Sequence, residues 1–91
     1  MMRHSEKELE WVYKALANHR RLLILKTLKH IKEGSVGDIA GEIKLSFNAT
    51  SKHLSILAHA GILARDQRSL LAFYSLAPGM SSVARHAVSI L

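Results

Sequence analysis

The sequence predicts a mainly α domain of the α+β class, with the element order α-α-α-α-β-β-α. Apolar residues recur at steps of three and four over the first 61 residues, and Ser or Asn is positioned to cap each run. Strand-like segments follow over residues 62–67 and 70–76, and the second of them alternates clearly. Helical spacing returns over residues 80–91, after a strong break at Pro78 and Gly79. These observations predict four helices, a two-stranded ribbon and a last helix.

The first two helices are predicted over residues 5–17 and 19–32. Ser5 and Asn18 are the expected N-caps, because their side-chain oxygens can accept hydrogen bonds from the free N–H groups at a helix start. Gly34 is the expected end of the second helix. The apolar stripes comprise Leu9, Val12, Tyr13 and Leu16 in the first helix and Leu22, Leu25, Leu28 and Ile31 in the second. Each helix therefore has one face to bury.

Two shorter helices follow, joined by a tight link. Ser35 caps the third, with Asp38 at the capping-box position, and Ser46 caps the fourth. Gly61 is placed to end the fourth helix, because Gly adopts the left-handed conformation at little cost. Two short helices with a short link are typical of a helix-turn-helix, and a ribbon directly after them is typical of a wing. The sequence thus predicts a winged helix-turn-helix whose second helix would enter a DNA major groove.

The fourth helix is predicted to have two unlike faces. Its apolar back comprises Phe47, Thr50, Leu54, Leu57 and Ala58, and its polar front comprises Asn48, Lys52, Ser55 and His59. The back would be held by the core, whereas the front could form hydrogen bonds with base edges and phosphates. A solvated helix face is the plainer interpretation of the same front.

Composition and charge narrow the class of protein. The 91 residues contain no linker-like stretch and predict a single domain over residues 1–91, with a core small enough to favour shared burial with a second copy. Thirteen Lys and Arg against seven Asp and Glu give a net charge of +6, which indicates a polyanionic partner, nucleic acid before a membrane surface. The chain has no Cys, no apolar stretch of about 18 residues and no apolar signal segment. We therefore expect no disulfide, no thiolate metal site, no membrane partner and a cytoplasmic location.

Several blocks of the chain resemble the ArsR-type winged-helix repressors. YKALANHRRLLILKTL is similar to the second-helix signature of that family, and SVGDIAGEI is similar to its third helix. SKHLSILAHAGIL resembles its Ser-x-His-Leu-x-x-Leu-x-x-Ala-Gly-Leu element, and Tyr74 and Leu76 resemble the end of its wing. The resemblance covers about residues 11–77. It implies a homodimeric DNA-binding transcription regulator, usually a repressor, that dimerises through its first and last helices.

The resemblance also implies roles for individual residues. The candidates for DNA contact are Phe47, Asn48, Ser51 and Lys52 on the fourth helix, Arg65 and Arg68 on the wing, and Arg21 on the second helix. The candidates for the dimer interface are Leu9, Val12, Tyr13, Met80, Val83, Ala87 and Leu91. Two alternatives stay open, which are a solvated hairpin for the wing arginines and local closure of a helix turn for Arg21.

The chain departs from the metal-sensing members of that family. Ser35-Val36-Gly37 stands where those members have Cys-Val-Cys, and His86 has no acidic partner on the last helix. We therefore expect neither metal site and no cofactor. His4 and His86 could still meet across a dimer, because both lie on helices that would form its interface.

The predicted function is sequence-specific binding of a near-palindromic operator by a homodimer that represses transcription. Two departures keep a second hypothesis open, namely a winged-helix module for sequence-independent nucleic-acid binding or for protein contacts. Arg68-Ser69 replaces the usual Gly of the wing turn, and Phe47 replaces a commonly polar residue, which indicates either packing or contact with a thymine methyl group. An enzyme is not expected, because the chain has no Gly-rich phosphate loop, nucleophile elbow or paired carboxylates. Any effector, whether a small molecule in the dimer cleft or a protein, stays unidentified.

Overall fold

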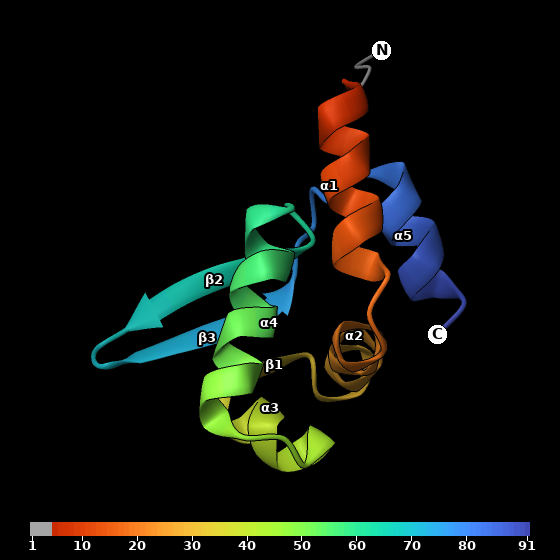
Figure 1. The fold of residues 1–91 in the computed structure, drawn as a ribbon. Helices are drawn as coiled ribbons and strands as arrows, with labels where there is room; N and C mark the ends of the chain where they lie inside the picture. The colour runs from red at the N-terminus through yellow and green to blue at the C-terminus, as the bar shows by residue number, and fades with distance from the viewer. Residues whose placement is uncertain (1–4) are drawn as a thin grey trace.

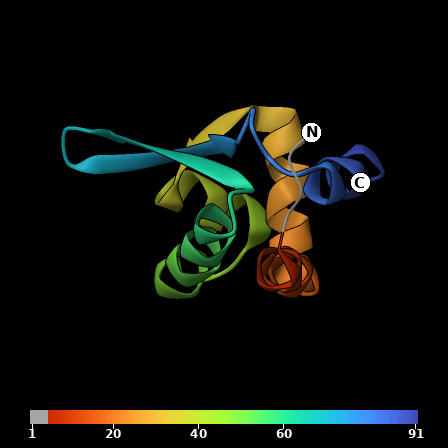
Figure 2. The same ribbon diagram turned by 90° about the horizontal axis from the view of Figure 1, so that it is seen from above.

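The computed structural model describes residues 5–91, in which five helices and a three-stranded sheet form a winged helix-turn-helix (Figure 1). The elements are α1 Glu6–Leu16, α2 His19–Ile31, β1 Glu33–Ser35, α3 Val36–Ile43, α4 Phe47–His59, β2 Leu63–Arg68, β3 Leu71–Leu76 and α5 Ser82–Ser89. α1 and α5 lie side by side, and the β2–β3 hairpin projects on the opposite side of the molecule (Figures 1 and 2). The predicted mainly α fold and element order are confirmed, with β1 as an additional strand.

Each helix in the described part of the chain begins at a side chain that caps it. The caps Ser5, Asn18, Ser35, Ser46 and Ser81 each accept a hydrogen bond from the backbone N–H three residues later, at 3.1 or 3.2 Å. The backbone N–H of Ser35 in turn donates to Asp38 at 3.0 Å, which completes the predicted capping box. These hydrogen bonds lower the pKa of Asp38, because they favour its charged form. Gly61, with a φ of 76°, ends α4 as predicted.

The prediction that Gly34 ends α2 is wrong. The helix ends instead at Lys32, whose φ of 71° turns the chain out of the helix. Gly34 lies in β1, opposite Tyr74 of β3. A Cβ atom at Gly34 would lie 3.2 Å from side-chain atoms of both Ile31 and Ile39. Close packing of the strand against α2 and α3 therefore explains this Gly.

The wing is a hairpin at the edge of an antiparallel sheet with the strand order β1-β3-β2. Its register ends at Arg68 opposite Leu71, so the two turn residues are Ser69 and Leu70 rather than the expected Arg68-Ser69. Ser69 has a φ of 56°, the left-handed conformation that Gly usually supplies in such turns. The side-chain amide of Gln67 donates to the carbonyl of Ser69 at 3.0 Å and so supports this turn. The hairpin therefore closes without Gly.

The core lies between α2, α3, α4 and the sheet, and it extends to buried side chains of α1 and α5. Its largest fully buried side chains are Ile24, Leu25, Leu28, Ile39, Thr50, Leu54, Leu57 and Ile62. Each such aliphatic side chain contributes about 1.5–3 kcal/mol through burial, and those of α4 fix the position of that helix. Thr50 differs from its neighbours, because its hydroxyl oxygen is buried with no hydrogen-bond partner among residues 5–91.

Candidate nucleic-acid interface

The first two turns of α4 present polar side chains to solvent. Asn48 and Lys52 are exposed and four residues apart, so they lie on one face of the helix, and Ser51 beside them is half-buried. The side chains of Asn48 and Lys52 make no hydrogen bond or ion pair with any other residue in the range 5–91. Their donors and acceptors are therefore available to a ligand. The structure thus brings together the polar residues that the sequence analysis selected on this helix.

Phe47 does not belong to the apolar back of α4, which corrects the prediction from helical spacing. Its side chain is 59% exposed. The physical reason is that α4 enters the core only from Thr50 onward, so the first turn extends beyond the elements that cover the rest of the helix. Phe47 lines a hollow with Leu71 and Ala72 of β3, but most of its side chain stays in water, at the same end of α4 as Asn48.

Arg68 is held in a cluster of opposite charge on the wing. Its guanidinium donates to both carboxylate oxygens of Glu33, at 2.8 and 2.6 Å, and to the carboxylate of Asp66 at 2.8 Å. It lies over the ring of Phe73, 4.7 Å from the centroid, and so reaches across β3 to β1. The hydrogen bonds, first to Glu33 and then to Asp66, raise the pKa of Arg68 above its usual value. Glu33 was not among the predicted site residues because β1 was absent from the predicted fold.

The two wing arginines are therefore not equivalent. Arg65 is exposed on β2 and donates to the side-chain oxygen of Gln67 at 2.7 Å. Because that partner is neutral, the charge of Arg65 is not offset. Contact of Arg68 with DNA, in contrast, would require its ion pairs to break or to share their hydrogen bonds. The contact predicted for Arg68 stays a prediction, and the arrangement favours a structural role.

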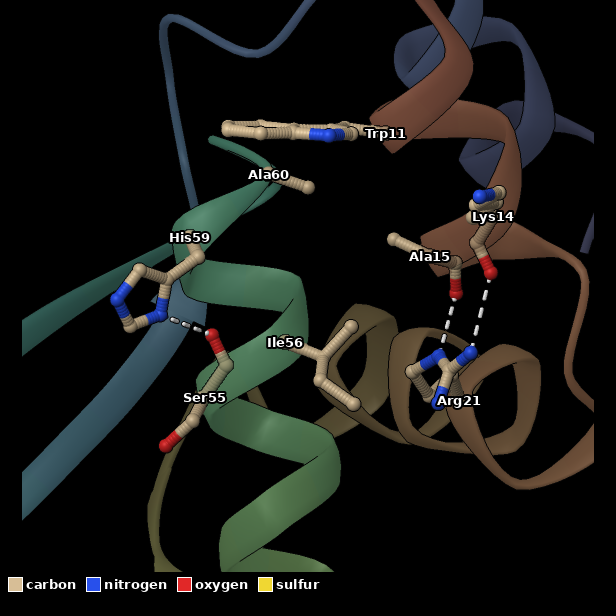
Figure 3. Close-up of a pocket in the computed structure, with 8 residues that line it drawn as sticks. All are labelled: Trp11, Lys14, Ala15, Arg21, Ser55, Ile56, His59 and Ala60. Atoms are coloured by element: carbon tan, nitrogen blue, oxygen red, sulfur yellow. Dashed lines mark hydrogen bonds between the residues drawn. The ribbon is translucent and has the colours of Figure 1, made fainter. Parts of the chain in front are cut away.

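Arg21 holds the end of α1 against α2 and α4. Its Nε and Nη2 groups donate to the carbonyls of Ala15 and Lys14, at 2.7 and 3.0 Å (Figure 3). Its Nη1 lies 3.2 Å from Nδ1 of His53 on α4, and because Arg only donates, that nitrogen must accept. Burial, and then the charges of Arg21 and Arg20, lower the pKa of His53, so the neutral ring is favoured. Local closure of a helix end is thus what Arg21 does in this structure, and its phosphate contact stays a prediction.

The predicted dimer residues are divided between the core and the surface of the protomer. Val12 and Met80 are buried within the protomer itself, so they present almost no surface to a partner. The half-buried members of the set are Leu9, Val83, Ala87 and Leu91. Tyr13 is 58% exposed. Ile90, which was not among the predicted interface residues, is 71% exposed. An apolar surface therefore remains along α1 and α5, but its composition differs from the predicted stripe.

Residues 5–91 contain neither a metal-binding cluster nor a membrane-spanning helix. Within residues 5–91, no three His, Asp or Glu side chains lie close enough together to hold a metal ion. His86 is exposed on α5, whereas His4 lies outside the described residues, so their meeting across a dimer stays a prediction. No helix in the described range has both the length and the apolar character needed to cross a bilayer.

The chain is similar in sequence to known bacterial regulators. Residues 18–65 match the family model described as "Bacterial regulatory protein, arsR family". Over 63 residues the chain is 40% identical to the transcriptional activator HlyU of Vibrio cholerae. That match covers 69% of this chain but only 57% of HlyU, so the chain spans little more than half of this relative's length.

Solved structures agree with the sequence comparison. Reduced HlyU from Vibrio cholerae has a TM-score of 0.76 at 32% identity, with 93% of this chain and 85% of that chain covered. A homodimeric winged helix-turn-helix DNA-binding domain from Mycobacterium bovis, a possible ArsR-family regulator, has a TM-score of 0.77 at 25% identity, with coverage of 99% and 85%. The family consists of transcriptional regulators, which are not enzymes. The chain therefore belongs to the arsR family of bacterial regulatory proteins, and its fold is that of a winged helix-turn-helix domain.

Proposed function

We propose that the protein is a homodimer that binds a near-palindromic DNA site sequence-specifically and represses transcription from it. The observation that carries this proposal is the polar face at the start of α4, formed by Asn48, Ser51 and Lys52, whose side chains have no partner among residues 5–91. In a helix-turn-helix, the N-terminal turns of the second helix are the part that contacts base edges. The net charge of +6 supports the same partner, because phosphate contacts dominate the affinity for DNA.

Each exposed residue of this face has a role that its chemistry supports. Asn48 suits bidentate pairing with adenine, and Lys52 suits guanine or phosphate. Phe47 has an exposed apolar ring at the same end of α4, and the methyl group of thymine is its natural contact in the major groove. Arg65 supplies an unopposed charge for phosphate or for a minor groove, whereas Arg68 maintains the shape of the wing.

The homodimer is supported by the apolar surface along α1 and α5 and by the homodimeric relative from Mycobacterium bovis. A twofold axis would then place two α4 helices in successive major grooves, about 34–36 Å apart.

Ala87→Glu would place a charge in the α5 surface, and we expect a monomer by sedimentation. Ser82→Glu, at the exposed first turn of α5, is the control and should stay dimeric. A dimeric Ala87→Glu variant would contradict the proposed interface.

Repression is the direction of regulation that the family resemblance implies. The curated relative from Vibrio cholerae is named an activator, so the direction needs its own test. A reporter gene placed behind the selected DNA site should be expressed less when the protein is present. Higher expression would assign activation instead. We also propose a cytoplasmic location, because a bacterial DNA-binding regulator acts where the DNA is.

The proposal is tested by selecting random DNA duplexes on the purified protein. We expect an inverted repeat that is bound roughly 10³-fold more tightly than a scrambled duplex. The logarithm of the affinity should fall linearly with the logarithm of the salt concentration, because bound Lys and Arg release counterions. Enrichment of an inverted repeat would also show whether two half-sites are read together.

A second candidate function is sequence-independent nucleic-acid binding or contact with another protein. The observation that favours it is a group of exposed apolar side chains on α4 and the wing. Phe47, Leu70 and Leu71 are 59%, 93% and 55% exposed. If the selection enriches no motif and all duplexes bind alike or not at all, this second function replaces the first.

A further inference from the structure

We propose that the groove between α1 and α4 binds a small organic anion that has an apolar or aromatic body and a carboxylate group. The groove is about 490 Å³ in volume and is lined by Trp11 and Ala15 of α1, by Arg21, and by Ile56 and Ala60 of α4 (Figure 3). This volume lies within the range of about 300–1,000 Å³ that is usual for small-molecule sites. The groove lies at the C-terminal end of α4, away from the residues proposed to contact bases.

The walls of the groove are apolar and open to solvent. Trp11 is 60% exposed, and its ring is seen edge-on above Ala60 in Figure 3. Ile56 is 44% exposed and extends from α4 toward α1 below this ring. An aromatic or aliphatic body placed between them would cover a Trp face and an Ile side chain that the protomer leaves in water. Such burial is favourable in proportion to the apolar area removed from water.

The charge in the groove selects an anion. Arg21 has five N–H donors in a rigid fork, and three of them are used by two carbonyls and by His53, all of which are neutral. Two donors remain, and no carboxylate in residues 5–91 forms an ion pair with this guanidinium. Among the described residues, none that lines the groove is acidic. A carboxylate matches the planar fork of a guanidinium, and the remaining positive charge makes it the complementary group.

A DNA phosphate is the other anion that Arg21 could meet. A phosphate backbone is hydrophilic along its length and would leave Trp11 and Ile56 uncovered. The apolar walls therefore favour the organic anion. The two walls belong to α1, which is part of the proposed dimer surface, and to α4, which is the proposed reading helix. A bound ligand would thus contact both helices, and an effect on DNA binding, unlike the binding itself, rests on the proposed function.

Trp11 makes the test direct, because it is the only Trp in the chain. The full chain is titrated with phenylbutyrate and, separately, with phenylbutanol at matched ionic strength, and Trp emission is recorded without any DNA present. We expect a saturable change in Trp emission with the carboxylate. The dissociation constant of the alcohol should be at least about tenfold higher, because the alcohol lacks the charge-assisted hydrogen bonds. Absence of a saturable change with either compound, or equal affinity for both, would overturn the inference.

Three variants localise the ligand. Ile56→Glu should abolish binding of the carboxylate, whereas Leu70→Glu, which adds the same charge at the exposed wing tip, should leave it unchanged. Arg21→Lys should weaken the binding of phenylbutyrate and leave the binding of phenylbutanol unchanged. Circular dichroism checks that each variant is folded, and since Ile56 is exposed, its variant remains decisive if Arg21→Lys unfolds. Wild-type affinity in Ile56→Glu would overturn the inference.

The DNA alternative has its own outcome. If Arg21→Lys weakens the binding of all duplexes by the same factor and leaves phenylbutyrate binding unchanged, Arg21 is a phosphate contact and the inference is overturned. Because the titration contains no DNA, a failure of the proposed regulator function would leave its result standing. The two proposals can therefore fail separately.

Discussion

α4 and the wing both carry basic side chains, but the two regions hold them differently. Lys52 on α4 has no partner among residues 5–91, whereas Arg68 on β2 makes three hydrogen bonds to two carboxylates. The charge of Arg68 connects β2 to β1, while that of Lys52 remains available to a ligand. A count of Lys and Arg in the sequence therefore overstates the charge that the wing can offer to a phosphate.

The same two regions differ in how they are anchored. The back of α4 is fixed by the fully buried side chains of Leu54 and Leu57. β2 has only Leu63 buried and is exposed from Arg65 to Arg68, so the outer part of the hairpin depends on its backbone ladder and on the Arg68 cluster. A side chain meant to select a base needs a rigid support, and α4 has one.

The largest expected effect is that of Lys52→Ala, which removes the available charge of α4. Loss of a contact with guanine should cost about 1–3 kcal/mol of specific binding, and binding to scrambled duplex should fall less. Titrations of labelled duplexes at fixed salt measure both. Lys26→Ala, exposed on α2, is the matched control and should change both affinities less. Equal losses on both duplexes would make Lys52 a phosphate anchor only.

The next largest effect is expected for the stability of the fold, from Thr50 on the buried side of α4. Thr50→Val keeps the shape of the side chain and removes a buried hydroxyl that lacks a partner in residues 5–91, so the free energy of unfolding should rise by about 1 kcal/mol. Urea unfolding measures the change. Thr27→Val, at a half-buried position on α2, is the control and should be close to neutral. A lower stability of Thr50→Val would show that the hydroxyl is satisfied, for example by an ordered water.

Glu33→Gln tests whether the wing can be made to resemble α4. Removing one carboxylate partner should release part of the charge of Arg68, so duplex binding should tighten at low salt. The slope of log affinity against log salt should steepen by no more than about one. Glu42→Gln removes the same charge from an exposed position on α3. If both variants tighten binding equally, net charge and not Arg68 is the cause.

The smallest expected effect is a pH dependence of stability that comes from His53, which links α4 to Arg21 of α2. The pKa of His53 is lowered in the fold, so the native state binds fewer protons there than the unfolded chain does. The free energy of unfolding should therefore decrease as pH falls below the ordinary value of 6.5 and be unaffected by this group well above it. Urea unfolding across this window should show a weaker pH dependence in His53→Gln than in the wild type. His59→Gln, at an exposed position, should behave like the wild type.

Much of the candidate interface could be predicted from the sequence because it depends on helical spacing. Asn48, Ser51 and Lys52 were found together because one helix carries them, and its cap Ser46 and its end Gly61 act within a few residues. Phe47 was wrongly expected to be buried because spacing alone does not say where along α4 the core begins. Glu33 was missed because its partner Arg68 lies 35 residues away in the chain.

The sequence by itself determined the starts of the first four helices, the order of the main elements and the polar face of α4. In each case the deciding interaction joins residues three or four apart, so local chemistry is sufficient. Only the tertiary structure decided that β1 pairs with β3, that Arg68 is neutralised by Glu33, and that Trp11 and Ile56 border one groove. Those contacts join segments distant in the chain, and they form only after the core has brought α1, α4 and the strands together.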